Sequence, residues 1–134
     1  MTDGLPGSPA EVPEHVGGPH AAYQALLAAG VLSFQACGAC SSAVFPPRGR
    51  CSSCGADALQ WRVSTGHGTV YSATTLTPRD RAAYSVVLVD LDEGYRMMSR
   101  IDQAPVAIDT RVTARLVRSG DDVLPVFDAE GEDR

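Results

Sequence analysis

Four cysteines in two C-x-x-C pairs are the residues of this sequence whose types and spacing most clearly indicate chemistry. Cys37 and Cys40 form the first pair, Cys51 and Cys54 form the second, and ten residues lie between the pairs. Two residues between paired cysteines let both sulfurs approach one ion, so the pattern predicts a tetrahedral Cys₄ zinc site. A shell of four thiolates leaves no open position for catalysis, and we therefore expect the zinc to be structural.

Two disulfides or a redox pair are the alternatives to a metal site. The N-terminal residues lack a basic region followed by an apolar run, so we expect no secretory signal and a cytoplasmic protein. A reducing compartment favours metal-bound cysteines over disulfides. Gly55, directly after the second pair, suits a turn whose backbone amides point at the thiolates.

The overall charge argues against several functions. The chain has 134 residues and a formal net charge of −5, and all eleven of its cationic side chains are arginine. An acidic balance disfavours a nucleic-acid surface, which needs clustered cations. Without lysine, neither a Schiff-base lysine nor a phosphate-loop lysine is available. No apolar run approaches the roughly 20 residues of a membrane span, so we expect a soluble chain without a membrane partner.

The elements that must position the cysteines follow from the pattern along the chain. Pro19 suits a first helical turn and Gly30 suits a helix end, whereas the second half reads as short strands separated by turn signals. We predict, in order, a flexible arm over 1–18, a helix over 19–31, a zinc ribbon over 32–65, a five-stranded OB-fold barrel over 66–128 and a frayed tail over 129–134. The predicted fold class is therefore mainly β.

The individual strands are predicted from runs of β-branched and aromatic residues. The ribbon is expected to have strands over 32–36 and 59–63, on either side of the cysteines. The barrel strands are expected over 68–76, 84–91, 95–101, 111–117 and 123–127.

One side of the predicted helix is apolar. Tyr23, Leu26 and Leu27 would share that side, where they would either cover the domain's own core or present the zinc module to a partner. Because both arrangements bury one apolar face, the sequence does not separate them, and we take the three residues as candidate partner contacts.

Together these features form an ordered series that resembles a known family. The series runs from the short helix through the Cys₄ ribbon with Phe45-Pro46-Pro47-Arg48 between its cysteine pairs, to Trp61, a Gly-x-Val-Tyr-Ser strand and a terminal Leu-Pro-Val-Phe. It is similar to the zinc-ribbon/OB-fold proteins of domain-of-unknown-function family thirty-five, which are associated with acyl-CoA enzymes. The resemblance spans residues 23 to 127.

The resemblance implies a non-catalytic accessory subunit. Such a subunit would form a hetero-oligomer with a thiolase-superfamily enzyme, a thiolase-like aldolase or a hydratase, and would help to hold the acyl-CoA, for example in steroid side-chain degradation. The sequence departs from the family pattern at Gln24, at Ile108-Asp109 and after Phe127, where Asp128 replaces a basic ending.

Four residues in and after the ribbon are candidates for CoA contacts. Arg48 and Arg50 have the planar donor fork that suits phosphate, and Phe45 or Trp61 could lie near the adenine. The competing interpretation is that Phe45 packs the ribbon against the barrel while the arginines are solvated.

Independent catalysis and nucleic-acid binding are the functional alternatives. His67 stands between two glycines, and no nucleophile elbow surrounds Ser64, so we expect no catalytic residues in this chain. Ribbons and OB-folds also bind single-stranded nucleic acid, but that mode needs stacking aromatics in a basic groove, which is unlike this acidic chain.

Overall fold

The structure is a computed structural model that describes residues 5–12 and 17–130. Within these residues it contains one helix, α1 (Gly18–Ala28), and nine strands in two sheets. The ribbon sheet has the order β1-β4-β2-β3, with β1 (Ser8–Pro9), β2 (Ser33–Cys37), β3 (Ala43–Val44) and β4 (Leu59–Val63). The closed barrel has the order β5-β6-β7-β9-β8, with β5 (His67–Leu76), β6 (Tyr84–Leu91), β7 (Arg96–Ile101), β8 (Arg111–Ser119) and β9 (Asp122–Ala129).

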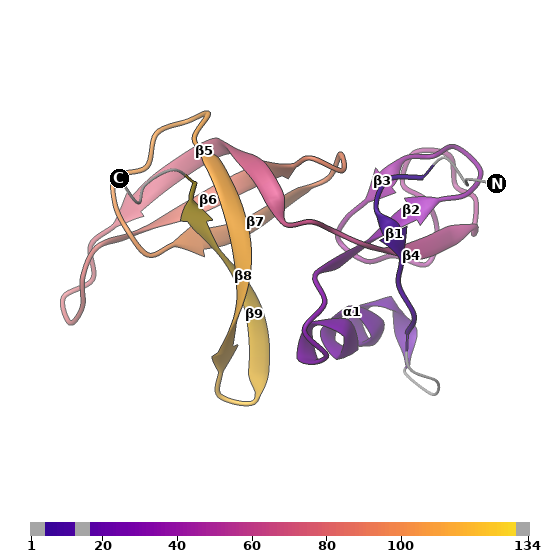
Figure 1. Cartoon of the computed structure of the whole chain (residues 1–134), viewed down its shortest axis with the longest axis horizontal. Coiled ribbons are helices and arrows are strands. Elements are labelled where there is room, and N and C mark those ends of the chain that lie inside the picture. Colours follow the sequence, from indigo (N-terminus) through magenta and orange to yellow (C-terminus); the bar gives the residue numbers. More distant parts are fainter. Residues whose placement is uncertain (1–4, 13–16, 131–134) are drawn as a thin grey trace.

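The predicted mainly β class, with a ribbon followed by a five-stranded barrel, is confirmed. Figure 1 shows the ribbon sheet and the barrel as two bodies joined by the chain between β4 and β5, with α1 below the ribbon. No helix in the described ranges is long and apolar enough to cross a membrane.

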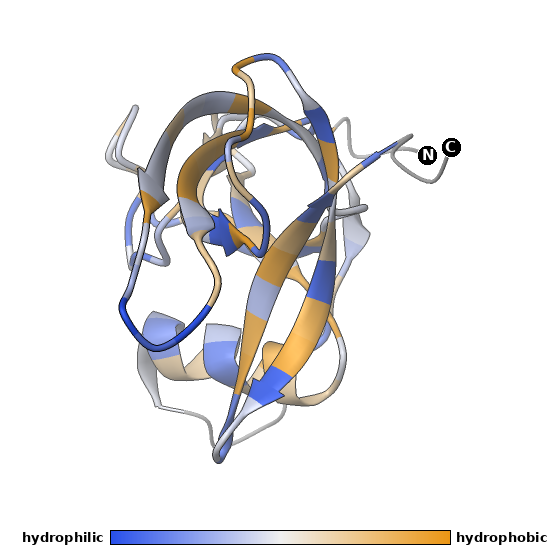
Figure 2. Cartoon of the chain, turned by 90° about the vertical axis from the view of Figure 1, so that its left-hand side faces the viewer, coloured by the Kyte–Doolittle hydropathy of each residue, from blue (hydrophilic) through white to orange (hydrophobic). Residues whose placement is uncertain are grey.

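Alternation along the strands forms the barrel interior. On β6 the side chains of Ser85, Val87, Val89 and Leu91 are buried, whereas the residues between them are half exposed. Figure 2 shows hydrophobic and hydrophilic bands alternating along the barrel strands. Gly68 allows β5 to lie against β6, because a β-carbon at this position would lie 2.7 Å from the backbone oxygen of Asp90.

The barrel closes through a short seam. Strand β7 pairs with β6 over its whole length, but its pairing with β9 is parallel and joins only Ile101 to Phe127. The side chain of Ser99 adds a second link across this seam, since its Oγ donates to the backbone oxygen of Pro125 at 2.6 Å. This parallel closure was not predicted from the strand pattern.

Helix α1 is shorter than the predicted range of 19–31. It begins with Pro19 in its first turn, as expected, but ends at Ala28. Gly30 has φ +87°, and the amide of Val31 donates to the backbone oxygen of Leu26 at 2.8 Å. These features end the helix at a glycine in the left-handed region.

The N-terminal segment corrects the prediction of a flexible arm over 1–18. Ser8 and Pro9 pair with Val63 and Arg62 of β4, and the buried Arg62 guanidinium donates to the backbone oxygen of Pro6 at 3.0 Å. Backbone carbonyls of this segment thus satisfy a buried cation, which fixes residues 5–9 on the ribbon. The Ala10 amide also donates to the backbone oxygen of Trp61 and Gly18 begins α1, while residues 1–4 and 13–16 of the prediction lie outside the described residues.

The predicted frayed tail over 129–134 is corrected at its start. Ala129 belongs to β9, and the amide of Glu130 donates to the backbone oxygen of Arg111 at 2.8 Å. The rest of this prediction, residues 131–134, lies outside the described residues.

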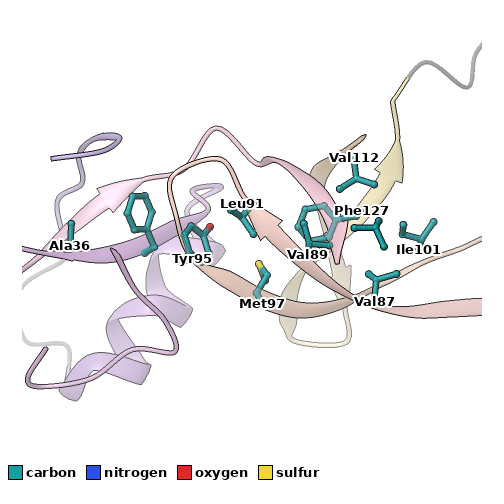
Figure 3. Packing of buried hydrophobic residues seen from close by; sticks show 11 residues of the cluster. Ala36, Val87, Val89, Leu91, Tyr95, Met97, Ile101, Val112 and Phe127 are labelled. Carbon is teal, nitrogen blue, oxygen red and sulfur yellow. The ribbon is translucent and has the colours of Figure 1, made fainter. Parts of the chain in front are cut away.

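Ribbon and barrel share one hydrophobic core. Phe34 of β2, whose side chain is fully buried, stacks on Tyr95 at the start of the barrel's β7 with 4.8 Å between ring centroids. Phe45, beyond β3, lies 5.2 Å from the same tyrosine ring. Figure 3 shows the cluster running from Ala36 through Tyr95 and Met97 to the barrel interior. The two modules are therefore packed as one unit.

A carboxylate reinforces this junction. Glu93, in the turn between β6 and β7, accepts hydrogen bonds from the Ser64 hydroxyl and the Thr65 amide, each at 2.8 Å. Ser64 and Thr65 lie in the connection between β4 and β5. The turn of the barrel thus binds the segment that leaves the ribbon, and the aromatic packing and this carboxylate act on the same junction.

Replacing Phe34 should therefore destabilise both modules together. We expect Phe34→Ala to lower the free energy of unfolding by about 3–5 kcal/mol, because it removes a fully buried ring from the shared core. Met98→Ala, at a side chain that is 66% exposed, should change it by less than about 0.5 kcal/mol. Chemical denaturation followed by circular dichroism measures both values. An unchanged unfolding midpoint for Phe34→Ala would show that the modules do not depend on this contact.

Candidate functional site: a Cys₄ ribbon packed on the barrel

The four predicted metal ligands meet at one point of the ribbon. The Sγ atoms of Cys37, Cys40, Cys51 and Cys54 all lie within 4.8 Å of one another. The Cys37–Cys54 sulfur pair is separated by 3.7 Å and the Cys40–Cys51 pair by 3.6 Å. Zinc–sulfur bonds of about 2.3 Å in a tetrahedron place sulfurs about 3.8 Å apart, so these thiolates fit a zinc ion.

The two cysteine pairs are held by equivalent turns. In the first turn the amide of Ala39 donates to Cys37 Sγ, and in the second the amide of Ser53 donates to Cys51 Sγ, both at 3.3 Å. These donors favour the thiolate form that binds metal. The backbone of Ala56, in the turn at Gly55, also hydrogen-bonds Cys54, and the backbone of Ser42 hydrogen-bonds Cys40 in the same way, as the sequence suggested for this turn.

Each turn is completed one residue beyond the pair. The amides of Ser41 and Gly55 donate to the backbone oxygens of Cys37 and Cys51, at 2.8 and 2.9 Å. Both residues have positive φ, at 68° and 79°. Glycine adopts this conformation without strain, whereas Ser41 adopts it as a residue with a β-carbon.

The four ligands differ in their surroundings. Cys37 and Cys51 are buried beside Val44, with Leu59 packed against them, whereas Cys40 and Cys54 are exposed. Hydrogen bonds with the Ser42 side chain and backbone lower the pKa of Cys40 to about 6. The site thus has two ligands anchored in a small core and two facing solvent. The ribbon holds zinc as a structural ion, since all four ligand positions belong to the protein.

The candidate CoA residues divide into two groups. Phe45 and Trp61 are partly buried and pack against the cluster of Tyr23, Leu27 and Leu32. Phe45 therefore lies between the ribbon and the barrel, as the alternative to a CoA contact had it. Arg48 and Arg50, in contrast, are exposed on the loop before the second cysteine pair.

The loop that carries these arginines is well fixed. The buried Gln35 side chain donates to the backbone oxygen of Arg48 at 2.8 Å and accepts from its amide at 2.7 Å. The guanidinium of Arg50 donates to the backbone oxygen of Gly55 at 3.1 Å. The sequence offered no signal for Gln35 in this role. Its effect is to hold an exposed arginine next to the zinc turns.

The candidate partner contacts on α1 are buried within this chain. Tyr23, Leu26 and Leu27 are only 7%, 3% and 1% exposed, because they face the chain's own core. Burial raises the pKa of Tyr23 to about 12. These residues position the helix on the ribbon and barrel, and Tyr23 and Leu27 also line the edge of a cleft.

A cleft lies where α1 meets the barrel seam. Its volume is about 360 Å³, and it is mainly apolar. Tyr23 and Leu27 of α1, Met97 and Met98 of β7, and Leu124 of β9 contribute to its walls. The short pairing between β7 and β9 leaves this space open.

His67 does not form a nucleophilic site with Ser64. His67 Nδ1 lies 2.8 Å from Glu130 Oε2 and its side chain is 47% exposed, whereas the Ser64 hydroxyl donates to Glu93. The Thr113 hydroxyl also hydrogen-bonds Glu130, which together with His67 lowers the pKa of the Glu130 carboxyl. This group connects β5, β8 and the end of β9 across the barrel surface.

A Cys₄ ribbon packed on a five-stranded barrel defines the class of zinc-ribbon/OB-fold proteins. The family model for the "rubredoxin-like zinc ribbon domain" of ChsH2 matches residues 25–60, and that for the "C-terminal OB-fold domain" of ChsH2 matches residues 61–117. Together they span well over half of the chain, which belongs to this ChsH2 zinc-ribbon/OB-fold family.

A solved structure resembles this chain over nearly the whole fold. The chain is similar to a chain of the "Ltp2-ChsH2(DUF35) aldolase", with a TM-score of 0.73 and 25% sequence identity. The similarity covers 87% of this chain and 98% of the other. No curated protein matches this sequence.

Loss of one buried ligand should abolish zinc binding. We expect about one zinc ion per wild-type chain by elemental analysis, and nearly none for Cys51→Ser, with loss of ribbon structure. Ser52→Ala changes an exposed residue in the same turn and should keep the metal. A folded wild-type protein without zinc would contradict the assignment.

Proposed function

We propose that this chain is a non-catalytic accessory subunit that binds and completes a thiolase-superfamily enzyme acting on acyl-CoA. The observation that carries the proposal is the similarity to a chain of the Ltp2-ChsH2(DUF35) aldolase. Because 98% of that chain is covered, the shared part is the complete zinc-ribbon/OB-fold unit and not a common fragment. The partner would be a thiolase or a thiolase-like aldolase, and a hydratase complex is a related setting.

The chemistry of the described residues supports a role without catalysis. The four thiolates fill the coordination shell of a structural zinc ion, and the exposed His67 is engaged by Glu130. The hydroxyl of Ser64 is likewise used in the junction between the modules. Under this proposal the partner supplies the nucleophile or base, and this chain supplies a rigid surface beside it.

The cellular setting belongs to the same proposal. A hetero-oligomer in the cytoplasm that degrades a steroid side chain or a related acyl-CoA fits both the reduced cysteines and the similarity to an aldolase. Single-stranded nucleic-acid binding fits less well, since the chain carries a net charge of −5.

The accessory role predicts a difference between the chain alone and the complex. The purified chain should not cleave an acyl-CoA, whereas its addition to a cognate thiolase-superfamily protein from the same genome should raise that protein's turnover of acyl-CoA at least about tenfold. A coupled assay of CoA or product release measures both rates. Turnover by this chain alone, or no effect on any such protein, would contradict the proposal.

We also propose that the exposed arginines of the ribbon loop contact CoA phosphate in that complex. Both guanidinium groups lie on a loop fixed by Gln35, so they could bind an anion without first ordering the backbone. Arg48→Ala or Arg50→Ala should then raise KM for the acyl-CoA about tenfold, as expected for loss of a charged hydrogen bond. Arg118→Ala, at an exposed arginine on β8, is the matched control and should leave KM unchanged. Equal KM values for all variants would place CoA away from this loop.

A further inference from the structure

One outer face of the barrel carries most of the exposed apolar side chains of the described residues. Three of the four exposed large hydrophobic residues lie there, Tyr71 and Leu76 on β5 and Met98 on β7, while the fourth, Ile108, lies in the loop before β8. Soluble monomers seldom gather such residues on one surface, and a contiguous apolar patch marks a contact site. The face formed by β5, β6 and β7 therefore requires an explanation.

The strand register shows that these residues share one face with the outer side of β6. Residues that are directly opposite in antiparallel strands project to the same side, and Leu88 is opposite Met98, while Tyr84 is opposite Leu76. Val86 lies between Tyr84 and Leu88 in the same outward row. An irregularity in the pairing between Val70 and Ser72 leaves Tyr71 outside the ladder.

This arrangement gives β6 two apolar sides. A barrel strand with one side in water normally alternates apolar and polar residues, whereas strands covered on both sides are apolar throughout. Inward Val87 and Val89 are matched by outward Val86 and Leu88, which are half-buried. The sequence of β6 is therefore that of a strand that is covered on both sides, although the residues that the structure describes bury only its inner side fully.

Arginines border the apolar centre. The Arg96 guanidinium lies over the Tyr71 ring at 3.6 Å and pairs with Asp90, and the Arg81 guanidinium lies over the Tyr84 ring at 4.7 Å. Arg100 pairs with Asp102. Arg96 and Arg100 thus have acidic partners, whereas Arg81 makes no ion pair within the described ranges. This border, with the β5–β6 loop, holds four arginines (79, 81, 96, 100) and three aspartates (80, 90, 102) in a chain with a net charge of −5.

A hollow lies at the end of this face, next to the unpaired cation. Its volume is about 290 Å³, and its walls include Arg81, Tyr84, Arg100 and Asp102. Tyr84 and Arg100 belong to the outward rows of β6 and β7, so the hollow is continuous with the apolar centre. An acidic side chain that enters it would meet the unpaired guanidinium of Arg81.

We propose that this outer barrel face, with Tyr71, Leu76, Tyr84, Val86, Leu88 and Met98 at its centre and Arg81 at its border, docks the partner enzyme. The inference rests on the proposed function, and it specifies the partner's contact as an apolar surface with an acidic residue at its edge. An apolar centre with a polar border is the usual composition of a stable interface. A second copy of this chain fits less well, because two of the three aspartates in its border, Asp90 and Asp102, already pair with Arg96 and Arg100.

A negative charge introduced at the border or at the apolar centre of this face tests the proposal. The experiment measures binding of the zinc-loaded full chain to thiolase-superfamily proteins from the same genome, by titration calorimetry. Met98→Glu and Arg81→Glu should each weaken binding at least about tenfold. Arg118→Glu introduces the same residue at an exposed arginine of β8, outside this face, and should bind like the wild type. Circular dichroism unfolding of each variant establishes that the fold is retained.

The outcomes separate this inference from the proposed function. If the wild type binds but both face variants bind equally well, the partner docks elsewhere and only the assigned surface is wrong. If the wild type binds no thiolase-superfamily protein, the proposed function itself fails. Light scattering provides a further check, because self-association that Met98→Glu abolishes would identify a second copy as the occupant and would overturn the assignment.

Discussion

The stack of Phe34 on Tyr95 is the contact on which the arrangement of this molecule depends. A zinc ribbon has too few residues to bury a large core of its own, and the five-stranded barrel closes only through a short β7–β9 seam. The two rings, at 4.8 Å, place the ribbon's β2 against the start of the barrel's β7 and merge both interiors into one cluster. The position of every exposed group on either module relative to the other follows from this junction.

The zinc site also supports this junction, because its ligands lie close to the two ribbon segments that contact Tyr95. Cys37 ends β2, three residues after Phe34, and Val44, which packs beside Cys37 and Cys51, directly precedes Phe45. The metal therefore fixes the two segments whose aromatic rings contact Tyr95. Its role in the structure is positional, because it holds the ribbon segments that pack on the barrel.

The sequence predicted the elements whose signal is local. The cysteine spacing determined the metal site, and β-branched alternation located the barrel strands, with 84–91 predicted at its observed bounds. It could not predict contacts between segments far apart in the chain. The pairing of Ser8 with Val63, the capture of residues 5–7 by Arg62, and the parallel closure at Ile101 and Phe127 all depend on tertiary packing. The apolar side of α1 was visible, but whether it faced the chain's own core or a partner required the structure.

The central claim is that this chain completes another enzyme, and the mass of the native assembly tests it most directly. Native mass spectrometry of the chain co-expressed with a cognate thiolase-superfamily protein from the same genome should show a single hetero-oligomer that contains both proteins and one zinc ion for each copy of this chain. A spectrum with only the separate proteins, under conditions where both are folded and this chain retains its zinc, would contradict the account.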